Sequence, residues 1–404
     1  MDYQLKYKPV IVVVAFNRLN ALKRLLSSLS ESDCPEGTKL IISIDFSPKN
    51  KDVYEFASRY DWPRGEKEVI YYEENLGLQQ HILKCGDLSL EYGSVIILED
   101  DLYVSGKFYD FAIQALDYYA EDDNISGVSL YKYPAIERRI KPLPFIPLEE
   151  ESDVHFIQFA SSWGQAWTKE QWIGFKEWYL ENPDLERFWG QVPWTVSDWP
   201  YTSWKKYFIS YMVEMNKFFV FPNSSHSTNF DDPGSNRSYT TYVYQSPLQV
   251  SNKNRYNFKD FKDSFNVYDA SFEILPEVLK QFNKHLQAYD FDVDLYGLKR
   301  ENELEKEYCL TTKKTKNFVF QFARSLKPHE SNIIMDVKGD EIKFAKKEDV
   351  IPIESTRDSY DDFVEKSIEL KVSDYSYFFR KVGYIRENLD LVWYLIKRKL
   401  FQSK

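Results

Sequence analysis

The sequence predicts an α/β fold, in which a mostly parallel, doubly wound sheet is followed by a C-terminal α+β extension. Apolar, β-branched runs alternate with amphipathic segments over the first 130 residues, and the connections between them are short. The first run, Val10–Ala15, is apolar throughout, as expected of a strand buried on both faces of a sheet. Repeated β-α units with short connections produce parallel sheets, so these observations define the fold class.

The elements of this first region follow from the period of their apolar residues. In the first predicted helix, Leu22, Leu25 and Leu29 recur at helical spacing. The predicted strands are 10–15, 39–44, 68–72 and 94–98, and the predicted helices are 19–29, 51–60, 76–92 and 106–119.

Downstream of residue 127 the pattern loosens, and eight tryptophans fall between residues 163 and 204. The segments 142–147, 191–200 and 222–237 are rich in turn-forming residues and are expected to be loops. Near the C-terminus we expect helices at 272–288, 361–371 and 377–399, and a hairpin at 333–344. The resulting domain organisation is 1–130, 131–265 and 266–404.

Composition and charge exclude several classes of protein. The chain has 404 residues, 43% of them hydrophobic and 28% charged, which is typical of a globular protein and excludes wholesale disorder. The formal net charge of −11 argues against a nucleic-acid binder that depends on a basic surface. An anionic ligand would therefore need a local source of positive charge.

The cysteines and the apolar runs bear on the compartment. Cys34, Cys85 and Cys309 are too far apart in sequence for a disulfide framework, so we expect a reducing, cytoplasmic environment. No apolar run approaches the 18 or so residues that a membrane-spanning helix needs. We expect a soluble protein, or a peripheral one at the inner face of the cell membrane.

Polar side chains follow the predicted strands at the edge where parallel sheets bind ligands. They are Arg18, Asp45, Asn75 and the triplet Glu99-Asp100-Asp101. Adjacent carboxylates repel one another unless a cation neutralises them, and a hard divalent ion with oxygen ligands suits such a group. The alternative for the triplet is a solvated acidic turn, which leaves the metal site a hypothesis.

These motifs, taken in order, resemble those of GT-A glycosyltransferases, and in particular of the N-acetylglucosaminyltransferase I type. VVVAFNR ends at Arg18, IISIDFS supplies Asp45, and ILEDDL supplies the Glu-Asp-Asp variant of the Asp-X-Asp motif. A Gly-Trp segment is similar to SSWGQAWTKEQW, and an aromatic-flanked Asp is similar to VSDWPYTSW. The resemblance covers about the first 250 residues and implies a Rossmann-like, metal-dependent sugar transferase.

The resemblance implies a role for each of these residues. Asp101 would ligate Mn²⁺ or Mg²⁺, Arg18 would lie near the diphosphate of a UDP-sugar, and Asp45 would accept the N3–H of the base. The remaining donor-binding candidates are Asn75, Glu99, Asp100 and Trp163. For Arg18 and Asp45, a surface arginine and a helix-capping aspartate are the alternatives.

An inverting transfer needs a carboxylate that deprotonates the acceptor hydroxyl. Asp198 is the first candidate, because it lies in an aromatic, proline-bounded loop where we expect partial desolvation. Asp231 and Asp232 are its competitors, and Asp232 is retained as a second catalytic candidate. The family has Asp-Asp where this chain has Ser197-Asp198, which leaves the assignment of the base open.

The C-terminal segment 384–401 is apolar on one helical stripe and ends in basic residues. It could contact an anionic membrane surface, which would suit a glycan or lipid-linked saccharide acceptor and a role in bacterial surface polysaccharide synthesis. A packed terminal helix is the alternative. Two other functions remain: a sugar-phosphate nucleotidyltransferase, whose glycine-rich loop is missing from AFNRLNALKRLL, and a non-catalytic glycan-binding protein.

Overall fold

The computed structural model describes residues 5–137, 143–188, 190–230, 232 and 244–353. By its internal contacts the chain divides into the units Met1–Pro352 and Ile353–Lys404. The predicted helices at 361–371 and 377–399 lie outside the described residues. All helices and strands of the described residues belong to the first unit.

The first unit is built from short strands and helices. The strands of its first half are β1 Val10–Ala15, β2 Leu40–Ile44, β3 Lys67–Tyr71, β4 Ser94–Glu99, β5 Leu102–Val104, β6 Ile125–Ser129, β7 Ala135–Ile136 and β8 Leu143–Pro144. The later strands are β9 Val154–Ile157, β10 Gln165–Thr168, β11 Phe218–Pro222, β12 Ser227–Asn229, β13 Val267–Tyr268, β14 Phe291–Asp294, β15 Tyr308–Thr311, β16 Phe320–Phe322 and β17 Ile342–Lys346. The α-helices are α1 Leu19–Ser30, α2 Lys51–Arg59, α3 Gly77–Tyr92, α4 Phe108–Tyr119, α5 Lys169–Glu181, α6 Trp194–Ser197, α7 Trp204–Glu214, α8 Pro276–Phe282 and α9 Ser331–Ile334.

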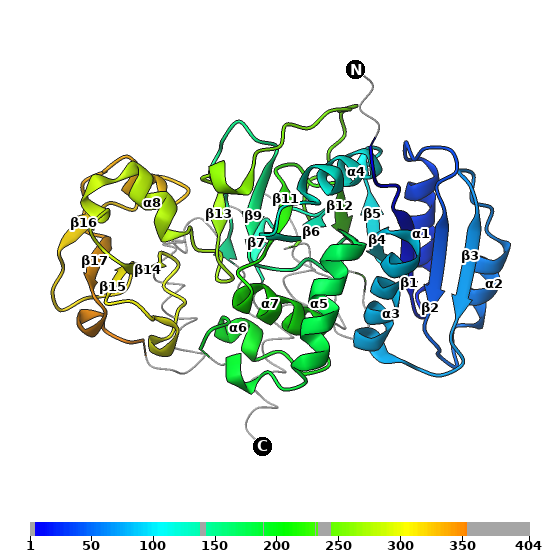
Figure 1. Cartoon of the computed structure of the whole chain (residues 1–404), viewed down its shortest axis with the longest axis horizontal. Coiled ribbons are helices and arrows are strands. Elements are labelled where there is room, and N and C mark those ends of the chain that lie inside the picture. The colour runs from blue at the N-terminus through cyan, green and yellow to red at the C-terminus, as the bar shows by residue number, and fades with distance from the viewer. Residues whose placement is uncertain (1–4, 138–142, 189, 231, 233–243, 354–404) are drawn as a thin grey trace, which may run out of the picture. The chain divides into compact units, whose positions relative to one another are not determined.

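A nine-stranded sheet with the order β13-β9-β11-β6-β10-β4-β1-β2-β3 organises the unit (Figure 1). Its β4-β1-β2-β3 half is parallel throughout, whereas β10 runs antiparallel to both of its neighbours. This confirms the predicted α/β class with a mainly parallel central sheet. Strands from both sides of the predicted boundary at residue 130 belong to this one sheet.

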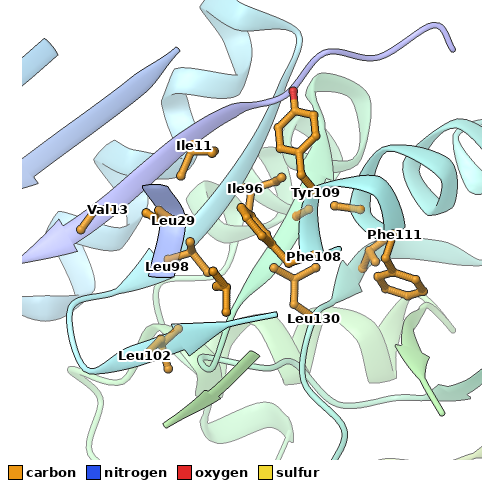
Figure 2. Packing of buried hydrophobic residues seen from close by; sticks show 14 of the residues in the cluster. Ile11, Val13, Leu29, Ile96, Leu98, Leu102, Phe108, Tyr109, Phe111 and Leu130 are labelled. Atoms are coloured by element: carbon orange, nitrogen blue, oxygen red, sulfur yellow. The ribbon is translucent and has the colours of Figure 1, made fainter. Parts of the chain in front are cut away.

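Helices cover both faces of the sheet, which explains why its strands are apolar on both sides. Helices α3, α5 and α7 pack against one another on one face. The other face carries the cluster of buried residues in Figure 2, where Ile11 and Val13 of β1 and Ile96 of β4 meet Leu29 of α1 and Phe108 of α4. The core thus fixes the ends of β1 and β4 next to each other.

The first eight predicted elements are confirmed, with their ends displaced by at most two residues. Local chemistry sets several of these ends. Helix α3 ends at Gly93, which has φ +78° and so adopts the left-handed conformation that glycine allows without strain. Helix α5 begins with a capping box between Thr168 and Gln171.

Predictions for the C-terminal region were less accurate. The predicted hairpin at 333–344 is wrong, because β17 pairs with β15 and β16 in a separate four-stranded sheet, and Ser331–Ile334 is helical. The predicted helix at 272–288 is confirmed only as α8, since Pro276 begins it and Asn283 ends it. The segment 191–200, expected to be a loop, contains α6.

Candidate active site

The predicted acidic triplet lies at the carboxyl end of the central strand β4. Glu99 is the last residue of this strand, and the backbone N–H of Asp100 donates to the carbonyl of Val14 in β1 (3.0 Å). The apolar run before the triplet is buried between helices, so the fold carries the carboxylates into a largely buried position. Asp100 is only 2% exposed.

Arg18 bridges two of these carboxylates. It follows β1 at the start of α1, and its guanidinium donates to Oδ2 of Asp101 (2.8 Å) and to Oδ1 of Asp100. A planar guanidinium suits two carboxylates held side by side. The structure therefore brings together three of the residues that the sequence singled out.

One arginine does not satisfy the whole cluster. Oδ2 of Asp100 and Oδ1 of Asp101 are buried without a hydrogen-bond partner among the described residues. Burial raises the pKa of Asp100 to about 6, against the opposing effects of Arg18 and of the backbone N–H of Phe16. Burial and then the charge of Asp101 raise the pKa of Glu99 to about 8. The cluster carries more buried acceptor oxygen than the protein itself can use.

Two carboxylates with unpaired oxygens fit a divalent cation whose remaining ligands come from a phosphate substrate and water. No group of three or more His, Cys, Asp or Glu side chains in the described ranges is arranged to hold an ion by itself. The residues present therefore fit a cation shared with a ligand, and they do not form a complete protein cage.

Asp45 and Asn75 come together at the ends of β2 and β3. Asp45 is 3% exposed and accepts the backbone N–H groups of Leu76 (2.8 Å) and Gly77 (3.1 Å), while the Asn75 amide lies 3.3 Å from it. In this structure Asp45 fixes the turn that begins α3. The Asp45 carboxylate already accepts these backbone N–H groups. Its expected hydrogen bond to the N3–H of a nucleotide base stays a prediction.

Asp232 is paired with Arg24 of α1. The Arg24 guanidinium also lies 3.7 Å from the ring centroid of Phe230, and the backbone N–H of Phe230 donates to the carbonyl of Asp101 (3.1 Å). Asp232 is thus linked to the acidic cluster through Phe230, with its charge balanced by an arginine that sequence reasoning had not considered.

Trp163 lies in an aromatic group with Tyr131 and Tyr244. Its ring packs against Tyr131 (4.8 Å between centroids) and Tyr244 (5.4 Å), and its carbonyl accepts the hydroxyl of Ser227 in β12. Gly164 follows with φ +94°, and a Cβ there would lie 2.7 Å from the Ser227 hydroxyl oxygen. A glycine is needed at this close approach, which explains the Trp-Gly pair of the motif.

Lys205 of α7 is a buried cation near the candidate site that the sequence did not reveal. It is 5% exposed and pairs with Glu137, and its Nζ lies 5.0 Å from the ring centroid of Trp199 and 5.6 Å from that of Trp163. Its charge opposes the rise in the pKa of Glu99. The signal in the sequence was a Lys-Lys pair inside the apolar helix WKKYFISYM.

Asp198 follows α6 as its C-cap and is exposed. The expectation of partial desolvation is therefore wrong, because Trp194 of this loop is buried in the core while Asp198 remains in solvent. The loop nevertheless approaches the sheet edge, since the Gln79 side chain in the first turn of α3 donates to the carbonyl of Tyr201 (3.1 Å). No contact joins Asp198 to the acidic cluster within the described residues.

Comparison with known proteins gives likenesses of structure only. No family model and no curated protein sequence matches the chain. Its structure is similar to that of GalNAc-T7 with UDP, GalNAc and Mn²⁺, with a TM-score of 0.40 and 15% identity over 61% of this chain and 47% of that one. It is also similar to S. aureus TarS 1-349, with a TM-score of 0.34 and 11% identity over 54% and 59% of the two chains.

A third similar structure is the mannosyltransferase PcManGT from Pyrobaculum calidifontis in complex with GDP-Man and Mn²⁺. The TM-score is 0.25, with 18% identity over 32% of this chain and 38% of that one. This chain thus covers about half the length of the first structures that it matches.

Proposed function

We propose that the chain is a metal-dependent glycosyltransferase of the GT-A type, which transfers a sugar from a nucleoside-diphosphate sugar to a glycan or lipid-linked acceptor. The observation that carries the proposal is that Asp100 and Asp101 each have a buried oxygen without a partner in the described part of the chain, at the sheet edge where α/β proteins bind ligands. Groups buried without partners are costly and are retained where a ligand completes them.

The roles of the residues follow from this geometry. Asp101, with Asp100 beside it, would hold Mn²⁺ or Mg²⁺, and the ion would supply positive charge to the diphosphate leaving group. The guanidinium of Arg18 already lies across both carboxylates, so it is placed to bind phosphate oxygens next to the ion. We expect UDP to be the nucleotide.

Asp198 remains the proposed general base of an inverting transfer. Its exposure is compatible with this role in the unliganded protein, because an acceptor bound over the loop would remove the carboxylate from water. Asp232 is the weaker candidate, because its charge is already balanced by Arg24.

The cellular setting is a further part of the proposal. Bacterial surface polysaccharide synthesis at the cytoplasmic face of the membrane stays a prediction. The segment 384–401, expected to contact a membrane, lies outside the described residues. In the part of the chain that the structure describes, no helix is long and apolar enough to cross a bilayer.

The test is to incubate the protein with a panel of nucleotide sugars, Mn²⁺ and acceptor saccharides, and to measure released nucleoside diphosphate. We expect turnover with at least one donor, and an Mn²⁺-dependent rise in melting temperature that Asp101→Ala abolishes. Asp153→Ala is the matched control, since Asp153 pairs with Lys253 away from the cluster.

Other outcomes would contradict the proposal. Release of pyrophosphate from a nucleoside triphosphate and a sugar phosphate would identify a nucleotidyltransferase. Binding of a glycan without any donor turnover, and with equal Mn²⁺ shifts in both variants, would identify a glycan-binding protein.

A further inference from the structure

The loop that carries Asp198 is held at its start by the C-terminal extension. The carboxylate of Glu303 accepts two backbone N–H groups, those of Trp194 at the start of α6 and of Arg300, each at 2.6 Å. Trp194 and Glu303 are 109 residues apart in sequence. One carboxylate therefore joins α6 to the extension, and burial raises its pKa to about 7.

Side-chain contacts reinforce this joint. The indole N–H of Trp194 donates to the carbonyl of Leu298 (2.9 Å), and the Arg300 guanidinium lies 4.6 Å from the indole ring centroid. A Cβ on Gly190 would come within 3.2 Å of the carbonyl oxygen of Asn302. The segment 298–303 thus packs closely on the residues that lead into α6.

The other end of the loop is held by Lys206 of α7. Its Nζ donates to the carbonyls of Ser197 and Trp199, both at 2.9 Å. These are the residues immediately before and after Asp198. Lys206 is 2% exposed, so its bonds to the two carbonyls are shielded from water.

The side chain of Asp198 provides no such anchor. Its carboxylate is exposed and has no hydrogen-bond or ion-pair partner among the described residues, so apart from the electrostatic attraction of Lys206 its position depends on the backbone. A misplacement of about 1 Å can cost an enzyme about 100-fold in rate. Whatever fixes the backbone around Asp198 therefore matters for any chemistry that Asp198 performs.

We propose that Glu303 and Lys206 are positioning residues that fix the backbone of Asp198 from its two sides, and that one role of the C-terminal extension is to hold this loop. The inference rests on the proposed function, because it takes Asp198 as the base. The proposal assigns a positioning function to the C-terminal extension, for which the sequence indicated no function.

The experiment compares Glu303→Gln and Lys206→Met with Glu330→Gln. Glu330 is a matched control, because it too is a buried glutamate of the extension, but it accepts the hydroxyl of Tyr268 and does not contact α6. Amide hydrogen exchange is measured over residues 194–201, together with kcat, the KM for the donor and the Kd for Mn²⁺ with UDP.

In both positioning variants we expect faster exchange at 194–201 and a fall in kcat of about 10- to 100-fold, because the base is displaced without being removed. The Kd for Mn²⁺ with UDP should not change, since the acidic cluster is not altered. Lys206→Arg, which can still donate to both carbonyls, should recover part of kcat. The control should leave exchange at 194–201 and kcat as in the wild type.

The proposal is overturned if the control raises exchange and lowers kcat as much as the two positioning variants do, or if those variants behave as the wild type. Failure of the proposed function would look different. If the wild type turns over no donor, an increase in amide exchange confined to 194–201 in the two positioning variants still supports their structural role. An increase spread uniformly across the chain overturns it.

Discussion

Two groups of buried charges in this protein differ in how completely they are paired. The first group is the acidic cluster at the end of β4, here called the strand-end cluster. In it Arg18 donates to Asp100 and Asp101, yet one oxygen of each carboxylate has no partner among the described residues. The second group, the C-terminal cluster, contains two ion pairs. They join Asp294 to Lys313 (2.8 Å) and Asp269 to Lys299 (2.6 Å).

The acceptor oxygens of Asp294 and Asp269 are in use, whereas Oε2 of the neighbouring Glu273 is buried without a partner among the described residues. Asp294 also accepts the backbone N–H of Lys299 (2.9 Å) and lies 3.3 Å from the Thr311 hydroxyl. Asp269 also accepts the backbone N–H groups of Ser271 and Glu273. Complete pairing is what a structural ion pair needs in a low-dielectric interior, whereas two adjacent carboxylates with unpaired oxygens leave a place for a cation. We therefore expect the carboxylates of the strand-end cluster to lower the free energy of unfolding. In the C-terminal cluster, removal of any one partner should lower it.

Lys313→Met provides the largest test of this comparison. The substitution leaves the Asp294 carboxylate, 0% exposed, without its ammonium partner. Removing one member of a buried pair typically destabilises a protein by about 3–5 kcal/mol. Urea unfolding at neutral pH measures the loss.

Adding Asp294→Asn to the Lys313→Met variant should recover part of this loss, because the uncompensated charge is removed. Equal stability of the wild type and Lys313→Met would show that the pair contributes nothing, and that complete pairing does not distinguish the two clusters.

Glu330→Gln tests the pH dependence of the same region. Burial raises the folded-state pKa of Glu330 from 4.5 to about 7. The folded state therefore holds its proton more tightly than the unfolded state, and this contribution is present below pH 4.5 and is lost as the pH rises to 7. By linkage the loss amounts to at most about 3 kcal/mol.

The Gln side chain cannot ionise, so the variant should become more stable relative to the wild type between pH 5 and pH 8. Unfolding free energies measured at both pH values check this. A difference between the two proteins that does not change with pH would place the titration elsewhere.

The first half of the fold could be predicted from the sequence because its signals are local. A run such as Val10–Ala15 is apolar throughout and helix α1 has a clear stripe, so burial and period identify both elements without any tertiary knowledge. The strand-end cluster followed from the rule that parallel strands end at one edge. The unpaired oxygens could not be predicted, since they depend on which side chain Arg18 reaches.

The C-terminal region was harder to predict because long-range contacts determine it. The partners of β17 are β15 and β16, at residues 308–311 and 320–322, so the Lys-Gly-Asp sequence that indicated a hairpin does not join two paired strands. Lys205 and Lys206 were missed for a similar reason. Their partners lie on other elements, and a lysine inside an apolar helix shows only that some partner must exist.

Asp100→Asn should raise the free energy of unfolding, whereas a substitution in the C-terminal cluster should lower it. In buffer with a chelator, the substitution removes a buried charge that repels Asp101 while it keeps the shape of the side chain. We expect an increase in unfolding free energy of about 1 kcal/mol, as is common when a functional site is neutralised. Asp294→Asn is the matched substitution in the C-terminal cluster and should destabilise the protein.

Thermal unfolding of Asp100→Asn and Asp294→Asn in the same buffer makes the comparison direct. With Mn²⁺ added, the difference in melting temperature between the two variants should narrow. Only Asp294→Asn keeps the intact strand-end cluster, so only that variant gains stability from the ion. Destabilisation by both substitutions in chelator would mean that the strand-end cluster is as structural as the other.

Asp232→Asn is expected to have the smallest effect. Asp232 pairs with Arg24, and the two side chains are 32% and 25% exposed, so the solvent screens the pair. Exposed or partly exposed pairs contribute at most about 1 kcal/mol, and Arg24 keeps its contact with Phe230. Sugar transfer should persist, since the proposed base is Asp198. If Asp232→Asn abolishes transfer while donor binding and stability are retained, the role of base moves to Asp232, and the pairing with Arg24 becomes a feature of the active site.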